Sequence, residues 1–96
     1  MYFFFKLLPP RPDFHLTMDE KENAVMKNHV AYWTALFEKR KVIVFGPVFD
    51  PSGVYGMAVI ETDTEEQANL IKDNDPAIAS GICTGNLFQM RVGLTK

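Results

Sequence analysis

The first long helical pattern in the chain follows Thr17 and continues to about Lys39. Its apolar stripe consists of positions three or four residues apart, namely Val25, Met26, His29, Val30, Trp33, Leu36 and Phe37. The segment Thr17-Met18-Asp19-Glu20 has the Ser/Thr-x-x-Glu form of a capping box, which predicts Thr17 as the N-cap. The pattern therefore predicts an amphipathic helix whose apolar stripe packs on the rest of the fold.

A shorter helix is predicted to begin after Asp63 or Thr64, because either residue can serve as its N-cap. Its apolar positions end near residues 72–74. Asp75-Pro76 then has the form of a new start, since aspartate is a preferred N-cap and proline a preferred first helical residue. Only about one turn can follow before Gly81.

Four segments have the β-branched and aromatic composition of strands: residues 2–8, Val42–Phe49, Val54–Glu61 and about Thr84–Val92. The second and third are predicted to form a hairpin, because Asp50-Pro51-Ser52-Gly53 between them is strong turn chemistry. The order strand-helix-strand-strand-helix-strand is that of the ferredoxin-like α+β fold. Its crossovers place both helices on one face of an antiparallel sheet.

The composition of the chain excludes several classes of function. A length of 96 residues leaves room for a single domain. The net charge of −2 and the scattered Lys and Arg residues argue against a nucleic-acid groove or a polybasic membrane patch. The apolar N-terminal strand stops at Pro9, short of the roughly 20 residues that span a bilayer. The single cysteine, Cys83, excludes an internal disulfide, and we expect a cytoplasmic protein.

The predicted strands are apolar on both faces, whereas a sheet with helices on one side should alternate apolar and polar residues. In the second strand, Val42 and Val44 are predicted to face one side and Ile43 and Phe45 the other. The first and third strands show the same lack of alternation. A monomer would expose a large apolar face, which soluble monomers rarely tolerate. We therefore expect a homodimer formed through this face of the sheet.

His29 is the candidate for acid–base chemistry, because it lies within the apolar stripe and should point toward the sheet. Such a histidine is either a hydrogen-bonded core residue or a general acid–base, since imidazole titrates near neutral pH. Asp75 is the best placed carboxylate to orient the ring, and it can cap the following turn as well. The two residues are predicted to be catalytic, with His29 moving the proton.

The link from the first strand to the first helix, Pro9–Leu16, is longer than the usual connection of about 2–6 residues. It is either a stiff surface connector or a rim above the open end of the sheet, with Arg11 or His15 meeting a ligand. Gly46-Pro47 is predicted to form a bulge or the end of the second strand, with its backbone lining the pocket.

Tyr32 is predicted to be an aromatic core or interface residue, or one whose hydroxyl reaches the ligand. His15 and His29 have no carboxylate at metal-ligand spacing, so no metal site is predicted. The sequence also lacks a phosphate-binding loop and a CxxC motif, and no cofactor is expected.

Several short motifs resemble the YciI-like (YCII-related) family. They are His29-Val30-Ala31-Tyr32-Trp33, Gly46-Pro47, Asp50 to Gly56, Glu66-Gln67-Ala68, Asp73 to Ala77 and Ser80-Gly81. The resemblance implies one YciI-like domain over residues 1–96 and the dimeric α+β barrel architecture. It also implies a His–Asp dyad in a pocket, which falls on His29 and Asp75. One branch of that family is a dehydrochlorinase that eliminates HCl from a chlorinated hydroxyhydroquinone, and wider relatives include isomerases.

Taken together, these features predict a small homodimeric enzyme with lyase or isomerase chemistry, acting without a cofactor on a small, polar, aromatic or unsaturated molecule. The alternative is a ligand-binding or purely structural dimer in which His29 and Asp75 only satisfy each other. A solvent-connected cavity beside His29 would favour the enzyme, and a filled core would favour the alternative.

Overall fold

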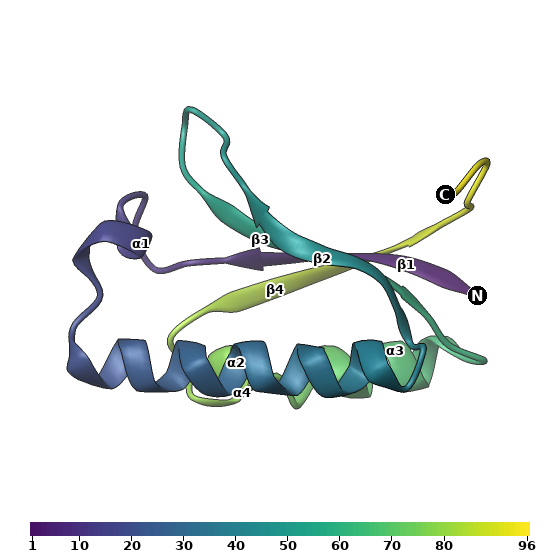
Figure 1. The fold of residues 1–96 in the computed structure, drawn as a ribbon, viewed down its shortest axis with the longest axis horizontal. Coiled ribbons are helices and arrows are strands. Elements are labelled where there is room, and N and C mark those ends of the chain that lie inside the picture. The colour runs from purple at the N-terminus through teal and green to yellow at the C-terminus, as the bar shows by residue number, and fades with distance from the viewer.

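The computed structural model describes residues 1–96 as one sheet with helices packed on one side (Figure 1). The elements in chain order are β1 (Tyr2–Leu8), α1 (Phe14–Thr17), α2 (Glu20–Glu38), β2 (Val42–Val48), β3 (Tyr55–Glu61), α3 (Glu65–Asp73), α4 (Pro76–Ala79) and β4 (Thr84–Met90). Helices α2, α3 and α4 cover one face, and α1 stands at one end of the sheet (Figure 1). This arrangement confirms the ferredoxin-like α+β fold. None of the helices combines the length and the apolar character that crossing a bilayer requires.

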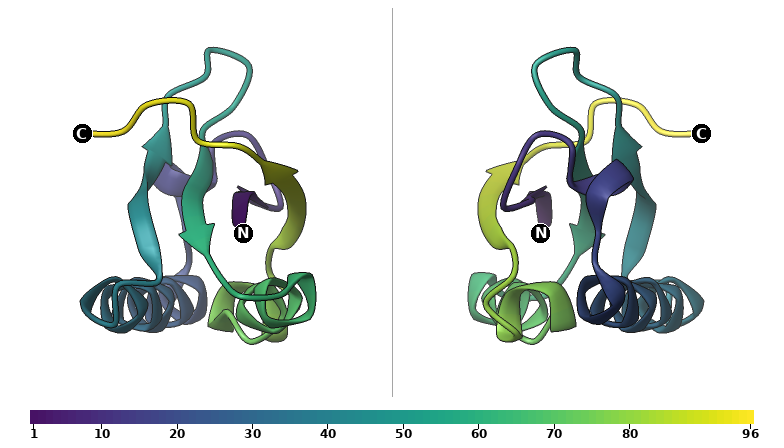
Figure 2. Two further views of the ribbon diagram at one scale, coloured as in Figure 1. Left: turned by 90° about the vertical axis from the view of Figure 1, so that its right-hand side faces the viewer. Right: turned by 90° about the vertical axis from the view of Figure 1, so that its left-hand side faces the viewer.

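The sheet is antiparallel with the strand order β2-β3-β1-β4, so β1 and β3 are central and the predicted hairpin of β2 and β3 is present. Figure 2 shows the sheet standing over the side-by-side helices α2 and α3. On β1, every second residue (Phe3, Phe5 and Leu7) is buried toward the helices. Trp33 of α2 is fully buried between two aromatic rings, with centroid distances of 5.0 Å to Phe5 and 5.6 Å to Phe45. These stacked rings fix α2 against the sheet.

A β-bulge interrupts β2 between Val42 and Val44, which makes Ile43 an extra residue relative to β3. One extra residue turns all later side chains to the opposite face. Val42 and Phe45 therefore both face the helices, where Val42 is buried and Phe45 stacks on Trp33. The prediction that Val42 shares a face with Val44, opposite Phe45, was wrong for this reason.

The N-caps of the helices follow the predictions in two cases out of three. Thr64 caps α3 and Asp75 caps α4. Helix α2 instead uses Asp19, whose carboxylate accepts from the Glu22 amide at 2.8 Å while Glu22 accepts from the Asp19 amide at 3.0 Å. The prediction of Thr17 was wrong because the same capping-box spacing recurs two residues later, and Thr17 belongs to α1.

Helix α4 packs directly on the backbone of β4, which fixes the position of Asp75 at its first turn. A Cβ atom added at Gly85 of β4 would lie 2.6 Å from Ile78 Cδ1 and 3.0 Å from Phe5 Cε1. A larger residue at this position would therefore require the Ile78 side chain to shift. The close packing of α4 and β4 therefore brings the N-cap of α4 against α2.

Candidate functional site

Two segments distant in the sequence bring His29 and Asp75 together. His29 lies in the middle of α2 on the side that faces the sheet, and Asp75 is the N-cap of α4. Their side chains meet although 46 residues separate them. His29 is 6% exposed and Asp75 is fully buried. The predicted contact between the two residues is therefore present in the fold.

The Asp75 carboxylate accepts hydrogen bonds from three different donors. Nδ1 of His29 lies 2.8 Å from Oδ1 and 2.9 Å from Oδ2. The Trp33 indole donates to Oδ2 at 2.8 Å, and the Ala77 backbone amide donates to Oδ1 at 2.9 Å. A buried carboxylate is costly unless it is hydrogen-bonded in this way. Asp75 thus caps α4 and orients the imidazole at the same time.

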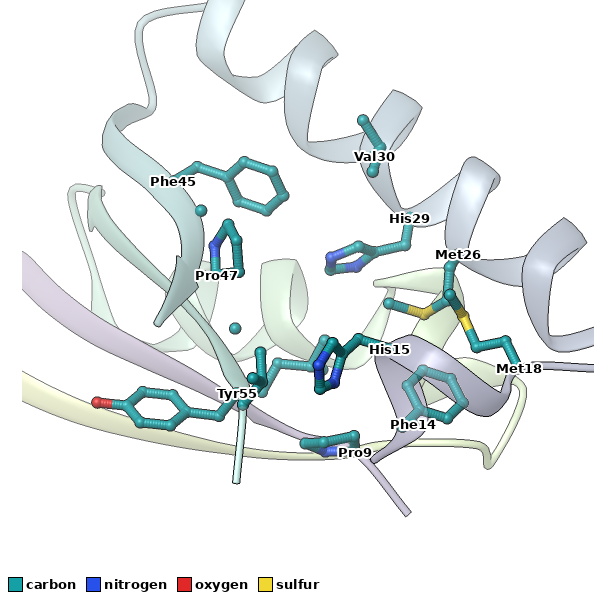
Figure 3. A pocket seen from close by; sticks show the side chains of 14 residues that line it. Pro9, Phe14, His15, Met18, Met26, His29, Val30, Phe45, Pro47 and Tyr55 are labelled. Carbon is teal, nitrogen blue, oxygen red and sulfur yellow. The ribbon is translucent and has the colours of Figure 1, made fainter. Parts of the chain in front are cut away.

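The carboxylate also decides which ring nitrogen of His29 carries the proton. Because an ionised carboxylate only accepts hydrogen bonds, Nδ1 must donate, and the neutral ring then has its lone pair on Nε2. Nε2 of His29 has no hydrogen-bond partner within the chain. Every fully buried side-chain nitrogen or oxygen of the protein does have one, so Nε2 is not fully buried and reaches open space. Figure 3 shows the ring pointing into a cavity. Nε2 is therefore available to exchange a proton with a bound molecule.

The cavity beside His29 has a volume of about 220 Å³ and lies between α1, α2 and the β2–β3 hairpin. Its walls are mostly apolar and include Met18, Met26, Phe45 and Val54, and no Asp, Glu, Lys or Arg side chain lines it. In Figure 3 the methionines and Phe45 flank the His29 ring on opposite sides. Such a lining with few polar groups suits a small, flat, largely apolar molecule.

Of the remaining predicted site residues, Gly46 and Pro47 line the cavity. They do not form a bulge, because both pair regularly with β3, but they do lie near the end of β2, which stops at Val48. Tyr32 does not line the cavity: its hydroxyl donates to the Ile71 carbonyl at 2.7 Å, and burial raises its pKa to about 12. Tyr32 thus ties α2 to α3.

Arg11 does not line the cavity either. Its guanidinium donates to both carboxylate oxygens of Glu22, at 3.0 and 2.8 Å, and to the hydroxyl and carbonyl of Thr17, at 2.8 Å each. Arg11 therefore fastens the segment that carries α1 to the first turn of α2. That segment is the rim proposed from the sequence, since Pro9, Phe14 and His15 line the cavity.

The sequence reasoning missed the part that Trp33 plays in the site. The sequence placed Trp33 only in the apolar stripe of the first long helix, but its indole also donates to Asp75. A signal was available, because Trp33 lies one helical turn after His29 on the same face and a buried indole N–H needs an acceptor. The cavity walls from Met18 and Met26 were also missed, since no motif marks an apolar wall.

Comparisons with known proteins agree with the fold. The profile of the YCII-related domain matches residues 2–90, and no curated protein matches the sequence. Among solved structures, the chain is similar to 5-chloro-2-hydroxyhydroquinone dehydrochlorinase (TftG) from Burkholderia phenoliruptrix AC1100 in complex with 2,5-dihydroxybenzoquinone. The TM-score is 0.68 at 16% sequence identity, covering 97% of this chain and 96% of that chain, so the likeness is one of fold. Because the domain profile spans nearly all of the sequence, the chain belongs to the family of YCII-related domains.

Proposed function

We propose that the protein is a small acid–base enzyme of lyase or isomerase type, in which His29 exchanges a proton with a small organic substrate. The observation that carries the proposal is the orientation of the imidazole: Nδ1 is held by buried Asp75, and Nε2 reaches the cavity. A core histidine that only satisfied its partner would not need open space at its second nitrogen. The alternative of a structural pair leaves the cavity unexplained.

The chemistry follows from this orientation. Neutral His29 takes a proton at Nε2, and the imidazolium that forms is stabilised by the negative charge of Asp75. In an elimination of HCl, the electron pair released by deprotonation moves through the unsaturated substrate and the C–Cl pair leaves as chloride. The apolar walls keep water away from this proton transfer. Neither step needs a group from outside the protein.

A flat, unsaturated hydroxy compound is the proposed substrate class. The cavity is small and mostly apolar, and the imidazoles of His15 and His29 are among the polar side chains that line it. The ligand of the dehydrochlorinase with the similar fold, 2,5-dihydroxybenzoquinone, is a molecule of this kind. A compound with several ring hydroxyls offers acidic protons to Nε2 while its ring contacts the methionines and Phe45.

The working form is proposed to be a homodimer. On the sheet face away from the helices, one apolar row crosses all strands, because Val44 pairs with Val59, Val59 with Phe4 and Phe4 with Phe88. Val44 is 47% exposed and Phe88 is 53% exposed. A second copy of the chain packed on this row removes the apolar surface from water.

Chloride release from 5-chloro-2-hydroxyhydroquinone and binding of 2,5-dihydroxybenzoquinone test the proposal. The wild-type protein is expected to bind the quinone and to release chloride. His29→Gln keeps a polar side chain and is expected to lose at least about 100-fold in chloride release while it still binds the quinone. Quinone binding without chloride release by the wild type would support the ligand-binding alternative, and absence of both would contradict the substrate class.

A further inference from the structure

His15 is the second imidazole at the cavity, and the site described so far does not use it. It lies on α1 and lines the same space as His29. In Figure 3 the His15 ring lies across the cavity from His29, and the two side chains come from different elements. Two imidazoles that line one cavity can contact two different atoms of one small bound molecule.

The segment that carries His15 is fixed in place. Arg11 binds Glu22 and Thr17 through four hydrogen bonds, the longest of them 3.0 Å. Phe14, the neighbour of His15, is buried in the core. Because both anchors lie within four residues of His15, the backbone that carries His15 is held at the cavity by the fold. The side chain itself is exposed to solvent.

We propose that His15 is a second catalytic residue, which acts as general acid opposite the general base His29, and that the substrate is a hydroxylated ring that must tautomerise before its leaving group departs. This inference rests on the proposed function of His29. A single base can remove a hydroxyl proton, but a ring carbon that gains a proton in the same step needs a second group as its donor. His15, which lines the cavity across from His29, is placed to be that donor.

The protons and electrons balance for a ring with several hydroxyls and one chlorine. A hydroxyl loses its proton to His29 Nε2, and the carbon that bears chlorine gains a proton from protonated His15, which gives the keto tautomer. A second hydroxyl then gives a proton back to His15, and the C–Cl bond breaks with its electron pair going to chloride. The product is a quinone, and His29 returns its proton to water. The sum is loss of one proton and one chloride.

The charged and titratable groups around His15 are few. Asp13 of the same segment and Asp50 of the β2–β3 hairpin share a shallow depression with it, and the Asp50 carboxylate is engaged by Ser52. His29 and Tyr55 line the same cavity, and Figure 3 shows the Tyr55 hydroxyl directed away from His15. Because an acid and a base must both be in the correct state, the rate of chloride release should pass through a maximum with pH.

The test compares His15→Gln with Leu16→Gln, a control on the same short helix that is 77% exposed and does not line the cavity. His15→Gln is expected to lower kcat for chloride release from 5-chloro-2-hydroxyhydroquinone by about 100-fold with little change in KM. It should also remove the fall in rate at high pH. Leu16→Gln should change neither. In the wild type, addition of 2,5-dihydroxybenzoquinone should shift the ring NMR signals of both histidines.

The outcomes separate this inference from the proposed function. Equal kcat and an unchanged pH profile in wild type and His15→Gln would overturn the role of His15 and leave that of His29 intact. His15 signals that stay in place when the quinone binds would overturn it as well, whether or not chloride is released. A wild type that binds the quinone and releases no chloride overturns the proposed function, and the acid role of His15 with it.

Discussion

Replacement of Asp75 by asparagine tests the hydrogen-bond arrangement around the candidate site. Three donors converge on the carboxylate: Nδ1 of His29, the indole of Trp33 at Oδ2 and the amide of Ala77 at Oδ1. Asparagine has one acceptor oxygen and one NH₂ group. If its oxygen faces Ala77, the NH₂ group meets the Trp33 N–H, and if the amide is turned over, the NH₂ group meets the Ala77 N–H.

The expected loss of stability in Asp75→Asn follows from the donor that loses its acceptor. The carboxylate is fully buried, so water cannot replace the missing hydrogen bond. One buried unsatisfied donor costs about 1–3 kcal/mol of the free energy of unfolding. Asparagine is nearly as good an N-cap as aspartate, so capping alone would predict almost no change. The stability of Asp75→Asn thus distinguishes a simple cap from a three-donor acceptor.

The same substitution changes the proton on His29. An NH₂ group beside Nδ1 favours the ring form in which Nδ1 accepts and Nε2 carries the proton. Urea unfolding measures the stability, and two-dimensional ¹⁵N–¹H NMR of the histidine ring identifies the protonated nitrogen. Asp73→Asn is the matched control, because that carboxylate is exposed and only pairs with Lys72 at 3.5 Å. A loss below about 0.5 kcal/mol, together with a ring still protonated at Nδ1, would refute this reasoning.

Three further predictions concern the fold and its assembly. Phe4→Asp should give a folded monomer by light scattering, whereas Phe5→Asp on the buried side of the same strand should unfold the protein; an unchanged Phe4→Asp dimer would contradict the proposed interface. Gly85→Ala should lower the free energy of unfolding, measured with urea, by about 1–3 kcal/mol. An unchanged free energy of unfolding would show that the contact between α4 and Gly85 can shift without cost. The hydrogen bonds that Arg11 donates lower the pKa of Glu22 from 4.5 to about 2, so the pair stabilises α1 fully above pH 4.5 and is lost as the pH falls toward 2. As the pH falls through that window, the rate of amide exchange in α1, corrected for its intrinsic pH dependence, should rise in the wild type. In Glu22→Gln the corrected rate should stay constant.

Local sequence rules were sufficient for the fold because most elements have a local cause. The Asp-Pro-Ser-Gly turn, the Thr64 cap and the Asp75-Pro76 start are each decided by neighbouring residues, and all are present. The bulge at Ile43 could not be predicted in this way, since it depends on how β2 pairs with β3. A single inserted residue was enough to reverse the facing of Phe45.

The candidate site was predictable in its pair of residues and less so in its surroundings. His29 stood out as a polar residue in an apolar stripe, and Asp75 as the carboxylate of an Asp-Pro start. The cavity walls depend on the packing of α1, α2 and the hairpin, which no local pattern records. Arg11 illustrates the same limit. The sequence suggested that its guanidinium could meet a ligand, but in the fold the guanidinium is bound to Glu22.

A crystal structure of the protein with 2,5-dihydroxybenzoquinone tests most directly the claim that Nε2 of His29 serves the cavity. We predict that a quinone oxygen lies within about 2.6–3.2 Å of Nε2, with Nδ1 still bound to Asp75 and the ring between the methionines and Phe45. A quinone bound elsewhere on the protein, or one seated in the cavity with no polar atom near Nε2, would contradict the account.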